Sequence, residues 1–214
     1  MLSKKIVVFF LMISLMTSLF CEEQRENKPS MFVFTMGPLG MLNLHDNSAP
    51  SPLLFSGGFG AQIEIKDKIS IAPHLSFFAN YYLVEENEVY PAEIEHRRAY
   101  APSFLLDIPV TYDKYFNNSI LRMGGGVSFL LRYALIADNT DSTVPDDVAL
   151  INSLFWKNMQ FIYPSLQISW DYVTETGFAT GVGLKVYVPI GSLISNGSLQ
   201  NGMISLSARF IPGT

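Results

Sequence analysis

The sequence has little cysteine, little histidine and little charge. Cys21 is the only cysteine among 214 residues, so the chain can form no internal disulfide. The three histidines show no metal-site spacing with one another or with Cys21, and we expect no metal or cofactor. Charged residues make up 15% of the chain and the net charge is -5, which argues against a nucleic-acid-binding protein.

Apolar runs long enough for a membrane-spanning helix are also lacking. The run at residues 6–13 follows Lys4 and Lys5, and it has the length of a signal peptide core. We therefore expect a signal peptide over residues 1–21, a polar and flexible lead-in over residues 22–30, and a single domain over residues 31–214. Two alternatives remain for Cys21: ordinary cleavage close to it, which the bulky Phe20 favours, or lipidation of Cys21 as the first residue of the mature protein.

What the sequence has in abundance is alternation of period two. Between residues 177 and 190 the even positions are almost all apolar, while the odd positions carry glycine, alanine, lysine, tyrosine and proline. Seven further segments alternate in a similar way, at about residues 31–44, 54–66, 69–83, 100–112, 121–133, 159–172 and 202–211. Pro38 and Gly40 interrupt the first segment, where we expect a bulge or a bend.

The lengths of the connections also alternate. Long links at about residues 43–51, 84–99, 134–158 and 191–201 separate pairs of segments that short turns join. This parity predicts an all-β fold: an eight-stranded antiparallel up-and-down transmembrane β-barrel with both termini on the side of the short turns. Residues 42–54 and 148–156 can hide two further strands, and residues 148–156 can equally form a short amphipathic helix.

Alternation alone does not say which face lies inside, and a lipocalin-like barrel would place the apolar face inward. The polar face, however, is rich in glycine and charge, while the other face is nearly free of charge, which favours apolar side chains facing lipid. The lumen is then expected to hold a polar cluster that fills the interior more readily than it lines a pore, made of Glu64, Lys66, His74, Asp107, Arg122, Arg132, Lys185 and Arg209.

Aromatic residues gather near both ends of the expected strands, as two membrane interfaces would select. At the long-loop ends these are Tyr81, Tyr82, Tyr100, Tyr133, Phe161 and Tyr163, and at the other ends Tyr112, Tyr115, Phe116, Trp170, Tyr172 and Phe210.

Two segments carry a family resemblance. Residues 104–112 (FLLDIPVTY), followed by a turn and residues 121–127 (LRMGGGV), resemble the small outer-membrane barrels of the OmpX, OmpA and OmpW type. Residues 202–210 resemble the C-terminal signal read by the barrel-assembly machinery. The resemblance implies an outer-membrane location in a Gram-negative-type envelope, for which the composition would suit a spirochaete, and a monomer with outer-membrane lipid and the assembly machinery as partners.

The function predicted on this basis is non-enzymatic, a structural or surface-interaction role, and an extracellular ligand would meet the acidic loops at residues 84–99 and 134–158. Two alternatives stay open. One is OmpW-like passage of small hydrophobic molecules through or out of the barrel. The other is a lipid A-modifying hydrolase, because His74 and Ser76 lie two residues apart on one strand face, as in lipid A deacylases; we assign no catalytic residue.

Overall fold

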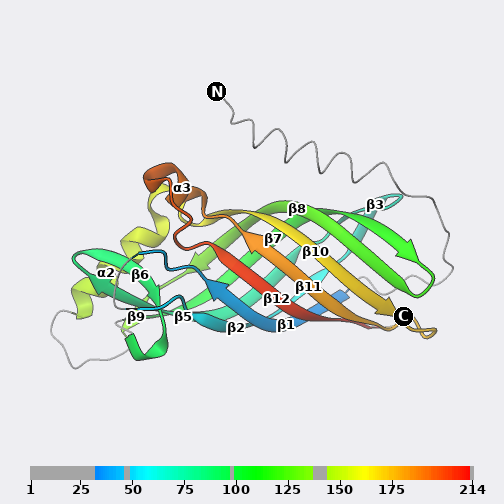
Figure 1. Cartoon of the computed structure of the whole chain (residues 1–214), viewed down its shortest axis with the longest axis horizontal. Coiled ribbons are helices and arrows are strands. Elements are labelled where there is room, and N and C mark those ends of the chain that lie inside the picture. Colours follow the sequence, from blue (N-terminus) through cyan, green and yellow to red (C-terminus); the bar gives the residue numbers. More distant parts are fainter. Residues whose placement is uncertain (1–31, 46–48, 97–98, 137–143, 213–214) are drawn as a thin grey trace.

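The computed structural model describes residues 32–45, 49–96, 99–136 and 144–212, so the expected signal peptide, Cys21 and the lead-in lie outside the described residues. Eight long strands form the wall of a barrel (Figure 1). They are β1 (Phe32–Met41), β2 (Leu53–Ala61), β5 (His74–Glu85), β7 (Ala99–Phe116), β8 (Ser119–Arg132), β10 (Ile162–Val173), β11 (Ala179–Tyr187) and β12 (Met203–Ile211). The predicted fold class is confirmed.

The barrel closes because β1 pairs antiparallel with β2 on one side and with β12 on the other. Four short strands extend the wall: β3 (Ile63–Lys66) and β4 (Ile69–Ile71) form a hairpin between β2 and β5, while β6 (Glu88–Ala92) pairs with β5 and β9 (Leu135–Ile136) with β7. Of the two stretches suspected of hiding extra strands, residues 148–156 form part of helix α2 (Val144–Trp156), which confirms the helical alternative, and the described part of residues 42–54 contains only the start of β2.

The barrel has two unlike ends. At the turn end, where β1 begins and β12 ends, short turns join β3 to β4, β7 to β8 and β10 to β11. At the loop end lie α2, α3 (Ile190–Asn196) and the 3-10 turns η1 (Ile94–His96) and η2 (Lys157–Met159). Figure 1 shows α2 beyond the end of the barrel and α3 beside its wall. The predicted parity of short turns and long loops is confirmed.

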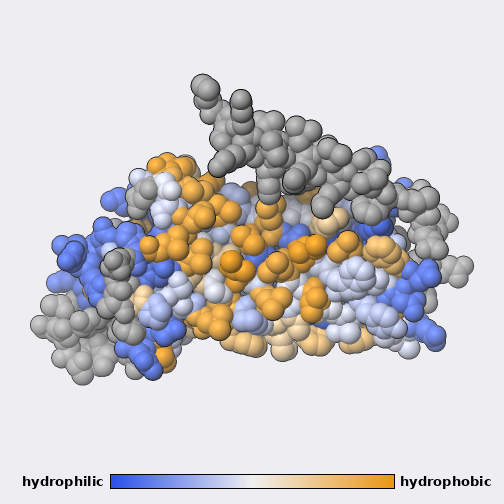
Figure 2. Space-filling view, in the orientation of Figure 1, coloured by the Kyte–Doolittle hydropathy of each residue, from blue (hydrophilic) through white to orange (hydrophobic). Residues whose placement is uncertain are grey.

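Apolar side chains cover the outside of the wall. Phe55 on β2 is 69% exposed, and the outward positions of the other strands are also apolar, including Phe104, Ile108, Leu166 and Val182. Figure 2 shows hydrophobic surface over the wall on the face in view, and we call this apolar outside of the wall the hydrophobic belt. The inward positions hold the polar residues, so the lipocalin-like alternative is wrong and the strands are of the transmembrane type. Among the described residues, no helix is long and apolar enough to cross a membrane.

Two details of the strands differ from the sequence-based predictions. Of the bulge or bend expected near Pro38 and Gly40, the bulge is wrong, because the register of β1 with β2 runs unbroken from Phe32 to Gly40. The pairing of β1 with β12 does skip Gly37 and Pro38. A register shift lies instead between Glu64 and Lys66 on β3. Strand β7 continues to Phe116, which leaves a turn of residues 117–118 and places Asp113 inside the strand rather than in the turn.

Apolar layers close the interior at both ends. At the turn end, a cluster of Val33, Ile120, Val173, Ala179 and Ile211 packs with Tyr115. Toward the loop end, a larger cluster includes Leu39, Phe78, Leu105, Tyr163 and Met203. Above it, Ile151 and Phe155 of α2 pack against Tyr82, two alanines of β7 and Ala134, which follows β8. The polar part of the lumen lies between these layers.

Candidate functional site: the charged lumen and the barrel mouth

The lumen contains a buried network of ion pairs centred on Asp171, a β10 residue with 0% exposure. Its carboxylate accepts a hydrogen bond of 2.9 Å from Arg209 Nε and another of 3.4 Å from an Arg209 Nη. The guanidinium of Arg122 also pairs with it. Three strands therefore contribute to one ion-pair group.

A glycine on the strand between them allows Asp171 and Arg209 to come into contact. In the barrel register Gly181 of β11 faces Asp171 on one side and Arg209 on the other. A Cβ at Gly181 would lie 2.4 Å from Asp171 Oδ1 and 2.1 Å from the carbonyl oxygen of Trp170. The missing side chain lets the two charged groups meet over the intervening strand.

Asp113 forms a second buried acidic centre, beside the first. Arg122 Nε lies 3.5 Å from Asp113 Oδ2, so this arginine bridges the two carboxylates. The hydroxyls of Ser70 and Thr111 each donate to Asp113 at 2.9 Å, and Gln62 Nε2 donates at 3.2 Å. The oxygens of Asp113 thus have several donors, as a buried carboxylate requires.

The third acidic centre is Asp107 on β7. Lys185 Nζ lies 2.6 Å from Asp107 Oδ2, and the hydroxyls of Ser128 and Ser165 donate to Oδ1 at 2.7 and 3.0 Å. The three carboxylates at 107, 113 and 171 are therefore matched by the three cations at 122, 185 and 209. A buried ion pair is costly unless hydrogen bonds satisfy its groups, and all three carboxylates accept such bonds.

His74 lies in the polar lumen, between two hydroxyl groups. Its Nε2 lies 2.9 Å from Thr35 Oγ1 and its Nδ1 lies 3.1 Å from Ser76 Oγ, so hydroxyls occupy both ring nitrogens. The ring rests against the backbone of Gly58 and Gly60, where an added Cβ would meet it at 2.6 and 2.9 Å. The neighbouring space is only about 10 Å³, which holds roughly one water molecule.

Arg132 is a fourth buried cation, and it lies apart from the other three. Its guanidinium donates a 2.5 Å hydrogen bond to the hydroxyl of Tyr82 and a 3.4 Å one to the carbonyl of Gln160. The guanidinium carbon lies 4.1 Å from the centre of the Phe155 ring and 5.7 Å from that of Tyr82. No carboxylate pairs with Arg132 within the ranges that the structure describes, so aromatic faces and oxygen dipoles stabilise its charge.

The predicted polar cluster therefore needs two corrections and two additions. Six of its members, His74, Asp107, Arg122, Arg132, Lys185 and Arg209, face the lumen. Glu64 and Lys66 do not, because β3 projects past the turn end and all four of its residues are exposed. Asp113 and Asp171 were missed, although both continue the inward alternation of strands recognised in the sequence.

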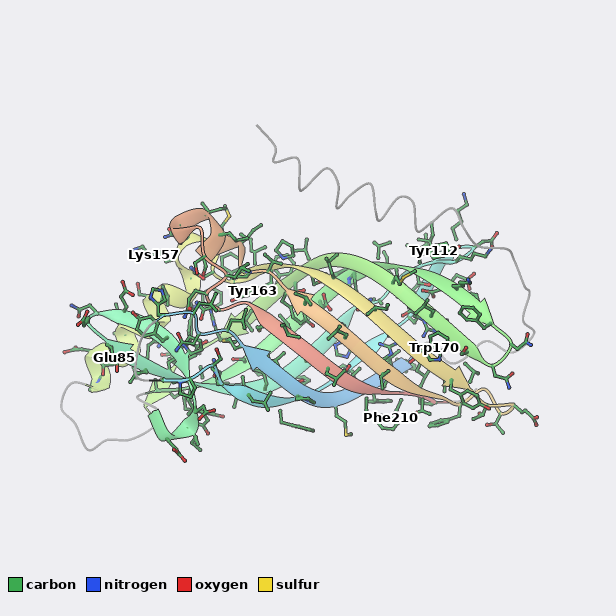
Figure 3. The ribbon with its side chains drawn as sticks, viewed as in Figure 1. Glu85, Tyr112, Lys157, Tyr163, Trp170 and Phe210 are labelled. Carbon is green, nitrogen blue, oxygen red and sulfur yellow. The ribbon has the colours of Figure 1, made fainter. Side chains whose placement is uncertain are left out.

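The aromatic rows are also corrected. Tyr82, Tyr115 and Tyr163 face inward, because they fall on the lumen parity of their strands; Tyr163 is 0% exposed. At the turn end Phe116 stacks on Trp170 with ring centres 5.6 Å apart, and Lys114 lies 4.7 Å above Phe116. In Figure 3 Tyr112, Trp170 and Phe210 lie toward the turn end, and Glu85 and Lys157 at the loop end.

A pocket of about 280 Å³ opens at the loop end, between α2, β6 and the segments around Gln160 and Gln200. Glu88 anchors one wall: its carboxylate accepts a 2.5 Å hydrogen bond from the Tyr90 hydroxyl and lies 4.0 Å from His45 Nδ1. Burial, and then this hydrogen bond, raise the pKa of Tyr90 to about 12. We call this cavity the mouth pocket. Sequence reasoning did not find it, since its walls come from distant segments.

No protein-family model matches the chain, and no curated protein matches it. Among solved structures, Neisserial surface protein A is 12% identical, with a TM-score of 0.54 over 89% of this chain and 100% of that one. Ail of Yersinia pestis is 7% identical with a TM-score of 0.42, over 86% and 99% of the two chains. The outer-membrane enzyme PagL is 12% identical with a TM-score of 0.38, over 85% and 99%. The likeness to Neisserial surface protein A is one of fold, that of the small outer-membrane barrels.

Proposed function

We propose that this protein is a non-enzymatic outer-membrane barrel, exported by its signal peptide, that acts through its loop-end surface and not through its lumen. The observation that carries the proposal is a hydrophobic wall around an interior filled by matched ion pairs and closed by apolar layers at both ends. An eight-stranded barrel has room for side chains and little more. Support for a monomer comes from closure of the wall within one chain. Outer-membrane lipid and the barrel-assembly machinery are its proposed partners.

Location and orientation can be tested on isolated outer membranes. The unboiled protein should migrate faster in a gel than the boiled one, because a closed barrel stays compact in detergent. Protease added to intact cells should cut within residues 84–99 and 134–158 and leave the short turns at the other end intact. Recovery of the protein in the soluble periplasmic fraction would contradict the proposal.

The surface role can be separated from conduction in planar bilayers. The polar lumen leaves a space of only about 10 Å³ beside His74, so we expect no stepwise ion conductance from the purified protein. Channels that open in steps at moderate voltage would contradict a closed lumen. A ligand of the mouth pocket should bind to cells carrying the intact protein and bind less to cells carrying Glu88→Gln, since Glu88 anchors one wall of that pocket.

The two alternative functions have less support. Passage of small hydrophobic molecules needs an apolar route, whereas the middle of the lumen holds charged groups around Asp107 and Asp171. Hydrolysis of a lipid by His74 and Ser76 needs access from the membrane, but His74 faces inward and is buried. Uptake of a labelled alkane by cells that carry the protein would support the first function. Release of acyl chains from lipid A would support the second.

A further inference from the structure

The two helices of the loop end have opposite polarity. On α2 the buried side chains are apolar, Ile151 and Phe155, and the exposed ones include Asp146 and Ser153; among the side chains that the structure describes on this helix, only that of its last residue, Trp156, is large, apolar and exposed. This is the usual arrangement for a helix that packs on a protein core and faces water. Helix α2 therefore packs over the loop end of the barrel, with its outer side facing water.

Helix α3 reverses this arrangement. Its Ser192 is 2% exposed and donates a 3.2 Å hydrogen bond to Gln160 Oε1, while Ile194 is 70% exposed. Gly191 packs closely on the segment below, because a Cβ there would lie 2.4 Å from the carbonyl oxygen of Asn158. The helix thus turns a small, polar face toward the protein and a mainly apolar face away from it, where Leu193 and Ile194 are exposed beside Ser195, whose hydroxyl donates to the carbonyl oxygen of Gly191. This arrangement is unfavourable for a helix surrounded by water, because exposing apolar side chains to water costs free energy.

The apolar face of α3 belongs to a larger exposed surface, which we call the outer ledge. It consists of Trp156, Met159, Leu193, Ile194 and Leu199, all exposed. Val186 on β11 and Ile204 on β12, paired residues of the strands that flank α3 in the sequence, are exposed members of the belt, and Figure 2 shows hydrophobic surface both over α3 and on the adjoining wall. The belt is the surface that faces lipid, so the outer ledge extends an existing lipid contact.

The lack of charge in the loop that contains α3 also indicates contact with lipid. Residues 186–208, which include α3 and the ends of both neighbouring strands, contain no aspartate, glutamate, lysine, arginine or histidine. By contrast, the loop at residues 84–99 contains five glutamates. Placing a charged group near the hydrocarbon core costs much free energy, whereas water solvates it well. Residues 186–208 therefore have the composition of a membrane-facing segment, and residues 84–99 that of a solvated loop.

The position of the outer ledge along the barrel also fits. On β10, Trp170 belongs to the row of aromatic residues at the turn end of the barrel. Ile162 lies eight residues away on the same strand, close to η2 and at the same level as α3. At about 3.3 Å per residue and a tilt of about 40°, this is roughly 20 Å along the barrel axis. The apolar band of an outer-membrane barrel is about 25 Å tall. Helix α3 therefore lies at the level where hydrocarbon meets the headgroups on the far side.

We infer that the outer ledge is a membrane-interface anchor, in which α3 lies flat at the outer boundary of the bilayer with Ile194 and Leu193 among lipid acyl chains. This inference rests on the proposed membrane location and adds a specific contact to it. Because the ledge occupies one side of the wall, it fixes the depth and the tilt of the barrel.

The test places a fluorescent label at single cysteines, in a full-length background that carries Cys21→Ser. Ile194→Cys probes the outer ledge, Val182→Cys probes the belt and Ala149→Cys probes the exposed side of α2. Each variant is labelled with an environment-sensitive nitrobenzoxadiazole and placed in phosphatidylcholine nanodiscs with one protein copy each. Quenching is measured with nitroxide lipids whose quencher lies near the headgroup or deep in the acyl chain.

We expect the label at 194 to be quenched at least twofold more than the label at 149, and most strongly by the shallow nitroxide. The label at 182 should be quenched most strongly by the deep one. A label at 194 that behaves like the label at 149, while 182 is quenched, would overturn the anchor and leave the membrane location standing. Absence of quenching at 182 as well would overturn the membrane location itself. Single-copy nanodiscs ensure that a second protein molecule does not cover the ledge.

Discussion

Asp171 and Arg209 pair inside the barrel across an intervening strand, with Arg209 Nε 2.9 Å from Asp171 Oδ1. Their strands, β10 and β12, are both neighbours of β11, and the residue between them in the register is Gly181. One buried carboxylate thus serves two arginines, Arg209 and Arg122. The ion pairs therefore join β8, β10 and β12 through their side chains, across the glycine of β11 that lies between β10 and β12.

Removing the charge of Asp171 should destabilise the barrel strongly. Asp171→Asn keeps the shape but leaves the buried Arg209 without its carboxylate and Arg122 with Asp113 alone, and breaking a buried pair in this way costs about 3–5 kcal/mol. Urea unfolding in lipid vesicles, followed by tryptophan fluorescence, measures the loss of unfolding free energy. Glu95→Gln, an exposed change at the loop end, is the matched control and should leave the midpoint unchanged. Equal midpoints for the two variants would refute the importance of the network.

A methyl group at Gly181 should disturb the same pair without changing any charge. Its Cβ would lie 2.1 Å from the Trp170 carbonyl oxygen, which cannot move without bending β10. Overpacking of this kind costs about 1–3 kcal/mol. Gly40→Ala on β1 is the matched control, because the nearest atom to its Cβ would be 3.9 Å away. The refolding yield and the urea midpoint should fall for Gly181→Ala and hold for Gly40→Ala.

Period-two alternation predicted the eight strands, the sense of the two faces and most of the buried charges, because one parity places a side chain inside along a whole strand. The errors have a physical origin in strand length. Glu64 and Lys66 share the inward parity in the sequence, yet β3 extends beyond the part of the barrel that has an inside, and a register shift lies between the two residues. Asp113 has the right parity too, but a stretch of charged and aromatic residues near the turn made it look like loop.

The partners within the ion-pair network and the mouth pocket could not be predicted from the sequence, for a different reason. That Asp171 meets Arg209 depends on the register of three strands, and that register is set by hydrogen bonding around the closed barrel. Helix α3 carries no signal of its own at seven residues. Its inverted polarity becomes visible only when Ser192 is found inside and Ile194 outside.

The pair formed by Lys185 and Asp107 should show strong energetic coupling. Lys185→Met leaves the Asp107 carboxylate with two serine hydroxyls and no cation, while Asp107→Asn leaves an isolated lysine; each should cost about 3–5 kcal/mol. The double variant removes both charges and keeps the serine contacts, so it should be more stable than either single variant. A double-mutant cycle from urea unfolding measures this coupling. Additive losses would mean that the two groups do not interact.

The attachment of α2 to the barrel should depend on the ring of Phe155. This ring covers the guanidinium of Arg132 at 4.1 Å and packs against Tyr82, with ring centres 5.0 Å apart. Phe155→Ala removes about 3–5 kcal/mol of packing and uncovers a buried cation, so α2 should detach locally while the barrel stays closed.

Limited proteolysis in nanodiscs measures this detachment as the rate of cleavage within residues 144–160. Phe155→Leu keeps apolar volume but loses the aromatic face, and its cleavage rate should fall between those of Phe155→Ala and the unmodified protein. Leu154→Ala, a neighbouring and only partly buried position, should be cleaved like the unmodified protein. Heat-modifiable migration should persist in all three variants, because α2 contributes no strand to the wall. A Phe155→Ala protein that resists protease as well as the unmodified one would show that other contacts hold the helix, and that Arg132 does not depend on its aromatic cover.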